Sequence, residues 1–449
     1  MKKLTSFCCS IKKQASILGL FLVCSTISLM AKDKSLSVNF LKAGVGYSST
    51  SVNTTSFRNS SITTFRNTQY IAFYDADKYL VLGKRKLGDK KWETRRSNYV
   101  AHCEDAHNVI SIGVDGDGYL QLSFEQHAQK LKYCRSVAPG SLELTALMPM
   151  TGKQEVKVTY PEFHRFTNGD LMFVYRDGSS GNGNMVINHY DLKTKQWKMI
   201  QSNLIDGEKL RNAYWQMCVD KNDVIHVSWI WRESPKVETN HDMCYAKSYD
   251  KGKTWLKSDG TAYNLPINMA SAEMIYAIPQ NSELINQTGM AVDNRGDIYI
   301  ATYWKAKNTT VPQYRLIWHS AKGWNAMQVS HRTSPFSLAG PGTKKIPISR
   351  PKVAAKVKNN KVMVYYLYRD VEETNKVSVF YNDDFGKKGI WKQQNLTDFT
   401  VGEWEPSYDY ELWKSEGKLN VFVQHSAQGD RETVSLLEPQ NVYLMDVDY

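Results

Sequence analysis

The sequence predicts an all-β fold, a seven-bladed β-propeller with four-stranded antiparallel blades. Apolar and aromatic strands, bounded by Gly, Asn and Asp turns, recur along the chain at irregular spacings of roughly forty to sixty residues. No helical period competes with them, and several units share one kind of hairpin turn. Seven such units can be distinguished, and this number gives the number of blades.

The N-terminus has the features of a secretory signal peptide. Four lysines precede an apolar run from Ala15 to Met30, which ends near Ala31. This arrangement predicts a signal peptide over residues 1–31 and a mature protein that is secreted or periplasmic, with no membrane insertion after cleavage. A lipid anchor at Cys24 would need a small residue before it, but Val23 stands there.

Seven strand-rich units follow in order. The first contains QYIAFYD and YLVLGKRKL, and the second contains HNVISIGVDGDGYLQLSF and KLKYCRS. The third contains GDLMFVYRDG and MVINHYDL, and the fourth contains WQMCVD, VIHVSWIW and MCYAKSYDKGKTW. The fifth contains MAVDNRGDIYIATYW and YRLIWHS, the sixth KVMVYYLYRD and VSVFYND, and the seventh KLNVFVQHS and NVYLMDVDY. No composition shift divides them, so we expect one catalytic propeller domain over residues 32–449.

A shared turn supports the repeat. The sequences Asp-Gly-Asp-Gly-Tyr, Asn-Gly-Asp-Leu and Asn-Arg-Gly-Asp-Ile separate the first and second strands of three units, and such turns suit tight hairpins. The fourth unit adds an Asp-box, Ser248-x-Asp250-x-Gly252-x-Thr254-Trp255, the hairpin signature of sialidase-like propellers. The Asp-box is a folding motif and indicates nothing about catalysis.

The charge of the mature chain favours acidic partners. Removal of the four signal-peptide lysines lowers the formal net charge from +12 to +8. This surplus favours polyanions over neutral partners. No basic run or nucleic-acid-binding motif occurs, so we expect no nucleic acid partner and favour a secreted polysaccharide rich in uronate or sulfate. We expect the protein to act as a monomer.

Four cysteines remain after the signal peptide, namely Cys103, Cys134, Cys218 and Cys244. Four are too few for a disulfide scaffold in a chain of this length. Cys218 and Cys244, with His226 and His241 between them, leave a structural metal site open, although no CxxC pair is present. Buried free thiols are the simpler interpretation, and we expect no cofactor and no metal in the functional site.

Polar residues cluster where two adjacent units should meet the propeller channel. The segment from His102 to Asn108 opens the second unit, and His127 follows its second strand. In the third unit, Tyr160 before Pro161 and the segment from Tyr175 to Gly178 occupy the same places. Because the loops at the ends of inner strands form the mouths of a propeller channel, we expect these side chains to gather in one site.

These segments resemble the BNR-repeat propeller proteins that include ulvan lyases and related enzymes that cleave L-rhamnose-α-1,4-D-glucuronate. The resemblance is densest in DAHNVISIGVDGDGYLQLSF, TYPEFHRFTNGDLMFVYRDGSSGNGN and TNHDMCYAKSYDKGKTW. In the ulvan lyases of this fold, two histidines, a tyrosine and an arginine form the active site. The resemblance implies that His107 and His127, twenty residues apart, and Tyr160 and Arg176, sixteen apart, are the catalytic residues.

β-Elimination explains why these residue types are needed. The reaction removes the proton on C5 of a uronate, and the ionised carboxylate beside that carbon opposes the step. Arg176 can neutralise the carboxylate through a bidentate pair, and a neutral His107 can take the proton. Tyr160 would protonate the departing O4, and His127 would bind the carboxylate or the developing enolate. The roles of Tyr160 and His107 are interchangeable at this stage.

Further polar and aromatic residues at blade ends are candidates for substrate binding, because aromatic rings stack on sugars and amides bond hydroxyls. The principal candidates are Gln69, Asn108, Asn212, Tyr214, Arg232, Gln287, Trp304 and Arg350. Weaker candidates are Trp215, Asn286 and Tyr408. The competing interpretation is structural, since tryptophans also close propeller blades.

Two alternative functions stay open. An α-L-rhamnosidase would act on the same linkage at the opposite propeller face, and its activity is associated with a histidine in the first blade, where this chain has Gln69. Ordinary glycoside hydrolysis needs two flanking carboxylates, and nothing in the sequence pairs Glu104, Asp105, Glu403 or Glu405. A non-catalytic glycan-binding propeller would keep the aromatic residues and the basic channel without turnover.

Overall fold

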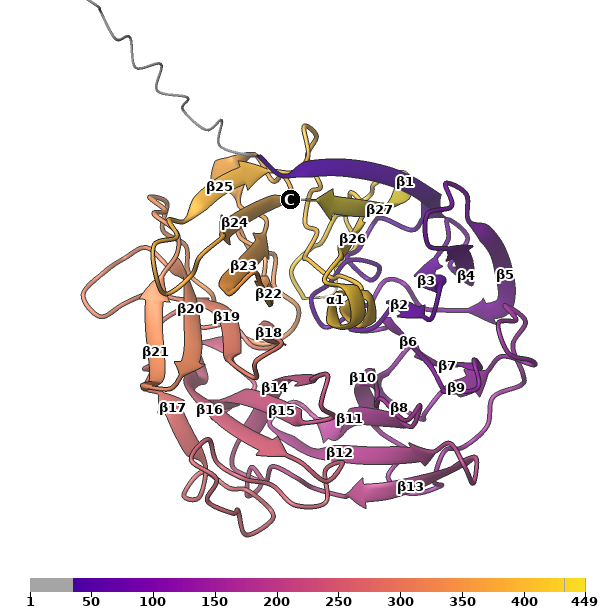
Figure 1. Ribbon diagram of the computed structural model, residues 1–449, viewed down its shortest axis with the longest axis horizontal. Helices are drawn as coiled ribbons and strands as arrows, with labels where there is room; N and C mark the ends of the chain where they lie inside the picture. The colour runs from indigo at the N-terminus through magenta and orange to yellow at the C-terminus, as the bar shows by residue number, and fades with distance from the viewer. Residues whose placement is uncertain (1–34, 432, 449) are drawn as a thin grey trace, which may run out of the picture. The chain divides into compact units, whose positions relative to one another are not determined.

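The computed structural model describes residues 35–431 and 433–448, and the predicted signal peptide lies outside them. The described residues from Leu36 onward belong to one compact unit. They form seven antiparallel sheets arranged in a ring (Figure 1). The seven-bladed β-propeller predicted from the sequence is therefore confirmed.

Four blades have four strands, each written from the inner strand outward. The first blade contains β2(Ile62–Phe65), β3(Thr68–Tyr74), β4(Tyr79–Lys86) and β5(Glu93–Val100), and the fourth contains β14(Asn212–Val219), β15(Ile225–Arg232), β16(Asn240–Ser248) and β17(Glu273–Tyr276). The fifth blade contains β18(Gly289–Val292), β19(Ile298–Trp304), β20(Gln313–Ser320) and β21(Gly323–Gln328). The sixth contains β22(Lys352–Lys358), β23(Lys361–Tyr368), β24(Ser378–Asn382) and β25(Lys392–Asn395). Successive inner strands contact one another around the channel.

The chain segment between the strands of the second blade contributes one strand, β8, to the third blade. The second blade holds β6(Ile110–Val114), β7(Leu120–Phe124) and β9(Tyr133–Arg135). The short β8(His127–Gln129) pairs with the third blade, which also contains β10(Val158–Arg165), β11(Leu171–Ser179), β12(Asn182–Asp191) and β13(Gln196–Gln201). Glu125 and Ala128, on either side of His127, have left-handed φ angles of 53°. Glu125 follows β7 directly, and Ala128 lies within β8, which pairs with the edge of β10.

The last blade closes the ring with both ends of the described chain. The N-terminal β1(Ser37–Gly46) pairs with β27(Gln440–Asp448), which pairs with β26(Leu419–Val423). The inner position is taken by a short segment in which Tyr408 bridges Val421. Long-range pairing of β1 with β27 fixes the blade that completes the channel wall.

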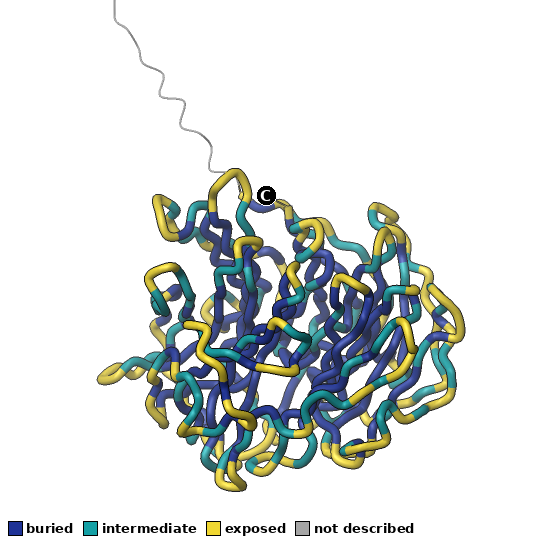
Figure 2. The backbone as a smooth tube through the Cα atoms, turned by 60° about the horizontal axis from the view of Figure 1, so that its bottom comes forward, coloured by how far each residue is buried: buried dark blue, intermediate teal, exposed yellow. Residues whose placement is uncertain are grey.

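Apolar side chains fill the spaces between neighbouring blades. Met172 and Val174 of the third blade pack with Trp215, Trp229 and Trp231 of the fourth in one buried cluster. Large apolar side chains contribute about 1.5–3 kcal/mol each when fully buried. Figure 2 shows buried backbone inside the fold and exposed loops at its margins. The exposed loops are therefore the segments that a ligand can reach.

The Asp-box forms the hairpin that its sequence predicts. Asp250 accepts hydrogen bonds from the backbone and hydroxyl of Thr254, and Ser248 accepts one from the Gly252 amide. The Trp255 indole is fully buried and donates to the Gly252 carbonyl. These contacts hold a turn within the fourth blade and leave no group for catalysis.

One α-helix, α1(Tyr410–Glu416), occurs in the described residues and lies near the middle of the ring in Figure 1. Asp409 caps its N-terminus through the Leu412 amide, and Gly417, with φ of 65°, ends it. Two short 3-10 helices, η1(Val237–Thr239) and η2(Val371–Glu373), lie in loops. Across the described part of the chain, no helix has the length and apolar character needed to cross a membrane.

The four described cysteines are free and buried. Cys218 belongs to the apolar cluster around Tyr245, whereas Cys244 belongs to the cluster around Trp229. His241 contacts Glu233 and Asp242, each at 2.9 Å, and not a thiol. Within the described residues, the structure does not bring Cys218, His226, His241 and Cys244 together as a metal site.

Candidate functional site

A polar pocket opens to solvent at one mouth of the channel, and its empty volume, including the open part, is about 760 Å³. It is lined by Phe57, His107, His127, Tyr160, Arg176, Ser180, Tyr214, Arg232, Pro235, Val237, Ile285, Asn286, Pro341, Gly342, Thr343, Lys344, Ile346 and Arg350. The four predicted catalytic residues are thus together, contributed by the segment before β6, by β8, by β10 and by β11. A pocket with converging charged groups is a strong candidate for a ligand site.

His107 and His127 form a stacked pair. Their ring centroids lie 3.9 Å apart with an interplanar angle of 15°. Nδ1 of His107 lies 2.9 Å from Oδ1 of Asp105, and Nδ1 of His127 lies 2.5 Å from Oδ2 of the same carboxylate. Burial raises the pKa of Asp105, but the hydrogen bonds from both rings outweigh burial and hold it well below its usual range. One ionised carboxylate therefore serves two histidines.

Phe57 extends this stack, with its ring 4.9 Å from that of His107. Within the described residues, Asp105, His107 and His127 are the group whose ligand atoms lie close enough to hold a metal, within 4.8 Å. A ring nitrogen binds metal through a lone pair in its own plane. Because the two ring planes are nearly parallel, one ion could not lie in both planes, and this arrangement does not suit a shared metal.

Tyr160 is held in a strained backbone conformation. Its φ is 57°, and a bulge interrupts the pairing of β10 with β11 between Thr159 and Glu162. Left-handed φ in a bulky residue costs on the order of 1–3 kcal/mol and is concentrated at functional sites. Burial raises the pKa of Tyr160 to about 12, against the opposing charge of Arg176. Its phenol therefore stays protonated at neutral pH, and no described residue hydrogen-bonds the hydroxyl.

Two arginines in the pocket have no carboxylate partner among the described residues. Arg176 is 2% exposed, its Nε and Nη1 have no hydrogen-bond partner, and its guanidinium lies 4.8 Å from the Tyr160 ring centroid. A Cβ on Gly183 would approach the Arg176 side chain to 2.7 Å, so glycine leaves space for it. Arg232 donates to the amide oxygens of Asn240 and Asn286. Buried guanidinium groups without counter-charges favour an anionic ligand.

Arg350 differs from these two arginines because it has a buried counter-ion. Its Nε and Nη2 donate to Glu405 at 2.8 and 2.6 Å. The pair neutralises the charge of Arg350 at the pocket wall. Its guanidinium also lies 5.0 Å from the Phe57 ring centroid, so Arg350 supports the aromatic end of the stack.

Tyr214 lies between the two unpaired arginines. Its hydroxyl is 2.8 Å from Oγ of Ser180, and the Arg232 guanidinium lies 4.3 Å from its ring centroid. Burial raises the pKa of Tyr214, but Arg232 and Arg176 outweigh burial and bring it to about 8. Tyr160 and Tyr214, with ring centroids 6.3 Å apart, therefore differ in how readily they lose a proton.

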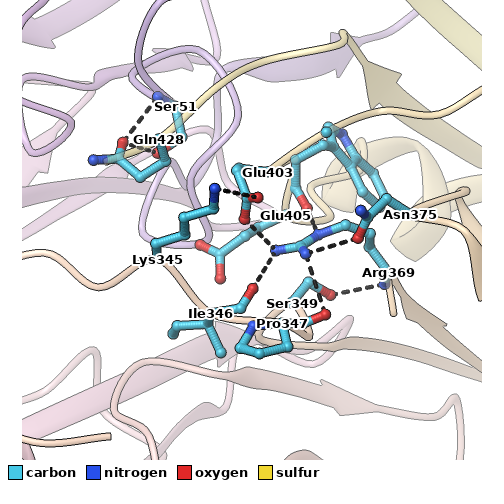
Figure 3. Close-up of polar contacts among 12 residues, drawn as sticks. Ser51, Lys345, Ile346, Pro347, Ser349, Arg369, Asn375, Glu403, Glu405 and Gln428 are labelled. Carbon is cyan, nitrogen blue, oxygen red and sulfur yellow. Dashed lines mark hydrogen bonds and ion pairs between the residues drawn. The ribbon is translucent and has the colours of Figure 1, made fainter. Parts of the chain in front are cut away.

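The loop that ends at Arg350 forms one wall of the pocket and is anchored from beneath by Arg369 (Figure 3). The Arg369 guanidinium donates to the carbonyls of Ile346, Pro347 and Trp404, and lies 3.3 Å from Glu403. These contacts join the loop to the last blade, so the wall is fixed.

Five predicted substrate-binding residues do not line the pocket. Gln69 donates to Asp409 and Asn420 and accepts from Arg85, so its amide is bonded within the protein. Trp304 is 4% exposed and packs beneath Arg315. The others are buried beside pocket residues, namely Asn108, Asn212 and Gln287. The side chains of all five lie outside the lining of the pocket.

The weaker candidates divide in the same way. Asn286 lines the pocket and accepts from Arg232. Trp215 lies in the core between the third and fourth blades, and Tyr408 donates to the Val353 carbonyl away from the pocket.

Several contributors to the site were not predicted from the sequence, among them Asp105, Phe57, Ser180 and Lys344. Asp105 was considered as a possible hydrolytic acid and not as the partner of both histidines. Phe57, Ser180 and Lys344 line the pocket without any local motif. The spacing of Asp105 two residues before His107 was the available signal, since an aspartate so placed can bond the following backbone amide, as it does here at 2.9 Å.

Comparisons with known proteins agree with this fold. The sequence profile of the BNR repeat-containing family matches residues 68–332. No curated protein matches the sequence. The solved structure of the polysaccharide lyase Uly1 has a TM-score of 0.64 at 15% identity, covering 87% of this chain and 90% of that one.

Two further solved structures are similar. An ulvan lyase from a new family of polysaccharide lyases, bound to GlcA(1-4)Rha3S, has a TM-score of 0.63 at 13% identity, with 90% of this chain and 94% of that one covered. The BP39L lectin from Burkholderia pseudomallei has a TM-score of 0.50 at 10% identity, with 82% and 94% covered. Identities this low indicate a shared propeller fold and nothing finer.

Proposed function

The chain belongs to the BNR repeat-containing family, and from this premise we propose that it is a secreted or periplasmic polysaccharide lyase. Its substrate is an acidic polysaccharide or oligosaccharide that contains L-rhamnosyl-α-1,4-D-glucuronate. It cleaves that linkage by β-elimination and leaves an unsaturated uronate. The proposal rests on one observation, the meeting of two histidines and a protonated tyrosine with the unpaired guanidinium of Arg176 in one pocket.

Each step of the reaction has a group suited to it. Arg176 pairs with the uronate carboxylate and lowers the cost of forming a carbanion at C5. His107, held against Asp105, removes the C5 proton. Tyr160 keeps its proton at neutral pH and delivers it to O4 as the glycosidic bond breaks. His127, stacked on His107, stabilises the developing enolate.

The nature of the substrate follows from the charges around the pocket. Arg176 and Arg232 lack carboxylate partners within the described chain, and Lys344 stands on the wall. An acidic sugar supplies the missing negative charge, whereas a neutral glycan would leave the buried guanidinium groups unpaired. The glucuronate–rhamnose ligand of the similarly folded ulvan lyase is a sugar of this kind.

Incubation of the mature protein with ulvan, and separately with a rhamnose-capped arabinogalactan, tests the proposal. We expect ultraviolet absorbance from an unsaturated uronate with one or both polymers, and the polymer that responds identifies the substrate. Chromatography for free rhamnose runs in parallel. Free rhamnose without absorbance would indicate an α-L-rhamnosidase, and binding without either product would indicate a glycan-binding propeller. Either result contradicts the lyase proposal.

A further inference from the structure

Asp105 contacts both histidines of the pocket through the same ring position. Each carboxylate oxygen serves one ring, at 2.9 Å from Nδ1 of His107 and 2.5 Å from Nδ1 of His127. Oδ1 also accepts a hydrogen bond from the His107 backbone amide at 2.9 Å. The Asp105 side chain is 26% exposed, so it is partly buried.

We infer that Asp105 is a positioning residue that fixes both histidines in the Nδ1-protonated tautomer. An ionised carboxylate can only accept hydrogen bonds, so each Nδ1 must donate. The neutral form of each ring then has its lone pair on Nε2, and that nitrogen becomes the base. The same carboxylate thus favours protonation at Nδ1 in two different side chains.

The stack alone cannot make this choice. Phe57, His107 and His127 lie ring on ring, with centroids 4.9 and 3.9 Å apart, which fixes the planes of the two imidazoles. A half-turn about the bond to the ring keeps the same plane but exchanges the positions of its nitrogen and carbon atoms. A polar partner distinguishes the two orientations, and Asp105 contacts Nδ1 of both rings.

The inferred role of Asp105 in turnover rests on the proposed lyase function, but the tautomers do not. They can be read directly by nitrogen NMR of protein carrying isotope-labelled histidine, recorded through a pH titration up to the pH at which the spectra show neutral rings. Spectra of His107→Ala and His127→Ala variants assign the two signals. We expect both rings to be protonated at Nδ1 in the wild-type protein. Protonation at Nε2 in both rings would overturn the inference, whether or not the protein is a lyase.

Substitution gives the second test. Asp105→Asn replaces an acceptor with an amide that can donate, so we expect at least one ring to change tautomer. On a substrate that the wild type cleaves, kcat should fall roughly 10²–10⁴-fold with a smaller change in KM. Asp105→Glu restores a carboxylate and should recover the Nδ1 tautomer and part of kcat. Unchanged tautomers and unchanged kcat in Asp105→Asn would overturn the inference.

Asp220→Asn is the matched control. Asp220 also accepts from two nearby backbone amides, at 2.8 and 2.9 Å, and lies 3.7 Å from Nε2 of His226. It belongs to a hairpin of the fourth blade and does not line the pocket. Its substitution should leave kcat and both tautomers as in the wild type. An equal loss of kcat in this variant would show that turn stability explains the effect, and would contradict the positioning role.

Discussion

The two ends of the propeller channel are built from the same strands but differ in how their charges are satisfied. β10 runs from Tyr160, in the pocket, to Arg165, which pairs with Glu411 of α1 at 2.8 Å. β14 likewise runs from Tyr214 to Val219, whose carbonyl accepts from Tyr410 of α1. The pocket end opens to solvent, whereas α1 lies over the other end and lines a second pocket there with Arg58 and Lys352.

The covered end is organised for stability. Glu411 pairs with Arg165 and with Lys414, and Trp413 donates to the Ala355 carbonyl. Asp409 caps α1 while it accepts from Gln69. At the pocket end, Arg176 has no carboxylate partner in the described chain and Tyr160 has a strained backbone. An unpartnered buried guanidinium is not confined to this end, because Nε and Nη1 of Arg58, beside α1, also lack hydrogen-bond partners. The pocket end differs because its unpartnered guanidinium lies with two histidines and the strained Tyr160, an arrangement that suits a ligand site.

The largest expected effect comes from a pair of tyrosine variants, one at each end. Tyr160→Phe removes the proposed proton donor, and we expect kcat to fall about 10³-fold with little change in thermal stability. Tyr408→Phe, at the other end, removes a buried hydrogen bond to Val353 and should lower stability by about 1 kcal/mol while leaving kcat unchanged. Kinetics on a cleavable polymer and thermal unfolding measure both. Near wild-type turnover in Tyr160→Phe would remove it from the mechanism.

Two arginine variants, one at each end, should have different effects on the free energy of unfolding. Arg176→Gln removes an unpaired buried charge, so we expect unchanged or higher stability and a kcat lower by roughly 10²–10³-fold. Arg165→Gln leaves Glu411 with Lys414 alone and should lower stability by about 1–3 kcal/mol without affecting kcat. Denaturant unfolding gives the stabilities. If both variants lose equal stability, the contrast between the two ends is wrong.

The helix cap tests the covered end by itself. Asp409→Ala removes the N-cap of α1 and an acceptor for Gln69 and Thr64. We expect a loss of about 1–2 kcal/mol of stability with kcat and KM unchanged. A large loss of turnover in a folded variant would place part of the reaction at the covered end, where a rhamnosidase site is expected.

The smallest effect is a change of stability with pH. The pKa of Tyr214 falls from its ordinary 10.0 to about 8 in the folded protein. Its ionised form therefore stabilises the fold above the unfolded pKa, and this contribution is lost as pH falls from 10 through 8. As the pH rises from 8 to 10, the free energy of unfolding of the wild type should therefore increase relative to that of Tyr214→Phe. Tyrosinate absorbance with a midpoint near 8 that is absent from Tyr214→Phe provides the independent check.

Repetition made the fold and the core of the site predictable from the sequence. Two adjacent blades repeat one layout, so His107, Tyr160 and Arg176 could be expected at one mouth of the channel. The pairing of β8 with the third blade was not predictable, because the path of the chain includes left-handed φ angles at Glu125 and Ala128, where no glycine marks them.

Long-range partners account for the substrate-binding candidates that lie elsewhere. Gln69 bonds Asp409 and Asn420, which come from the opposite end of the sequence. Local patterns carry no information about such pairing. The same limit applies to Arg350, which lines the pocket as expected but is paired with Glu405 of the last blade.

The most direct measurement of the central claim is the mass of the products formed in heavy-oxygen water. Elimination breaks the bond between O4 and C4 of the uronate without adding water, so we predict an unsaturated uronate product that carries no solvent oxygen. The other product keeps its original glycosidic oxygen. Incorporation of heavy oxygen into either new chain end would show hydrolysis, and would contradict the assignment of this pocket to a lyase.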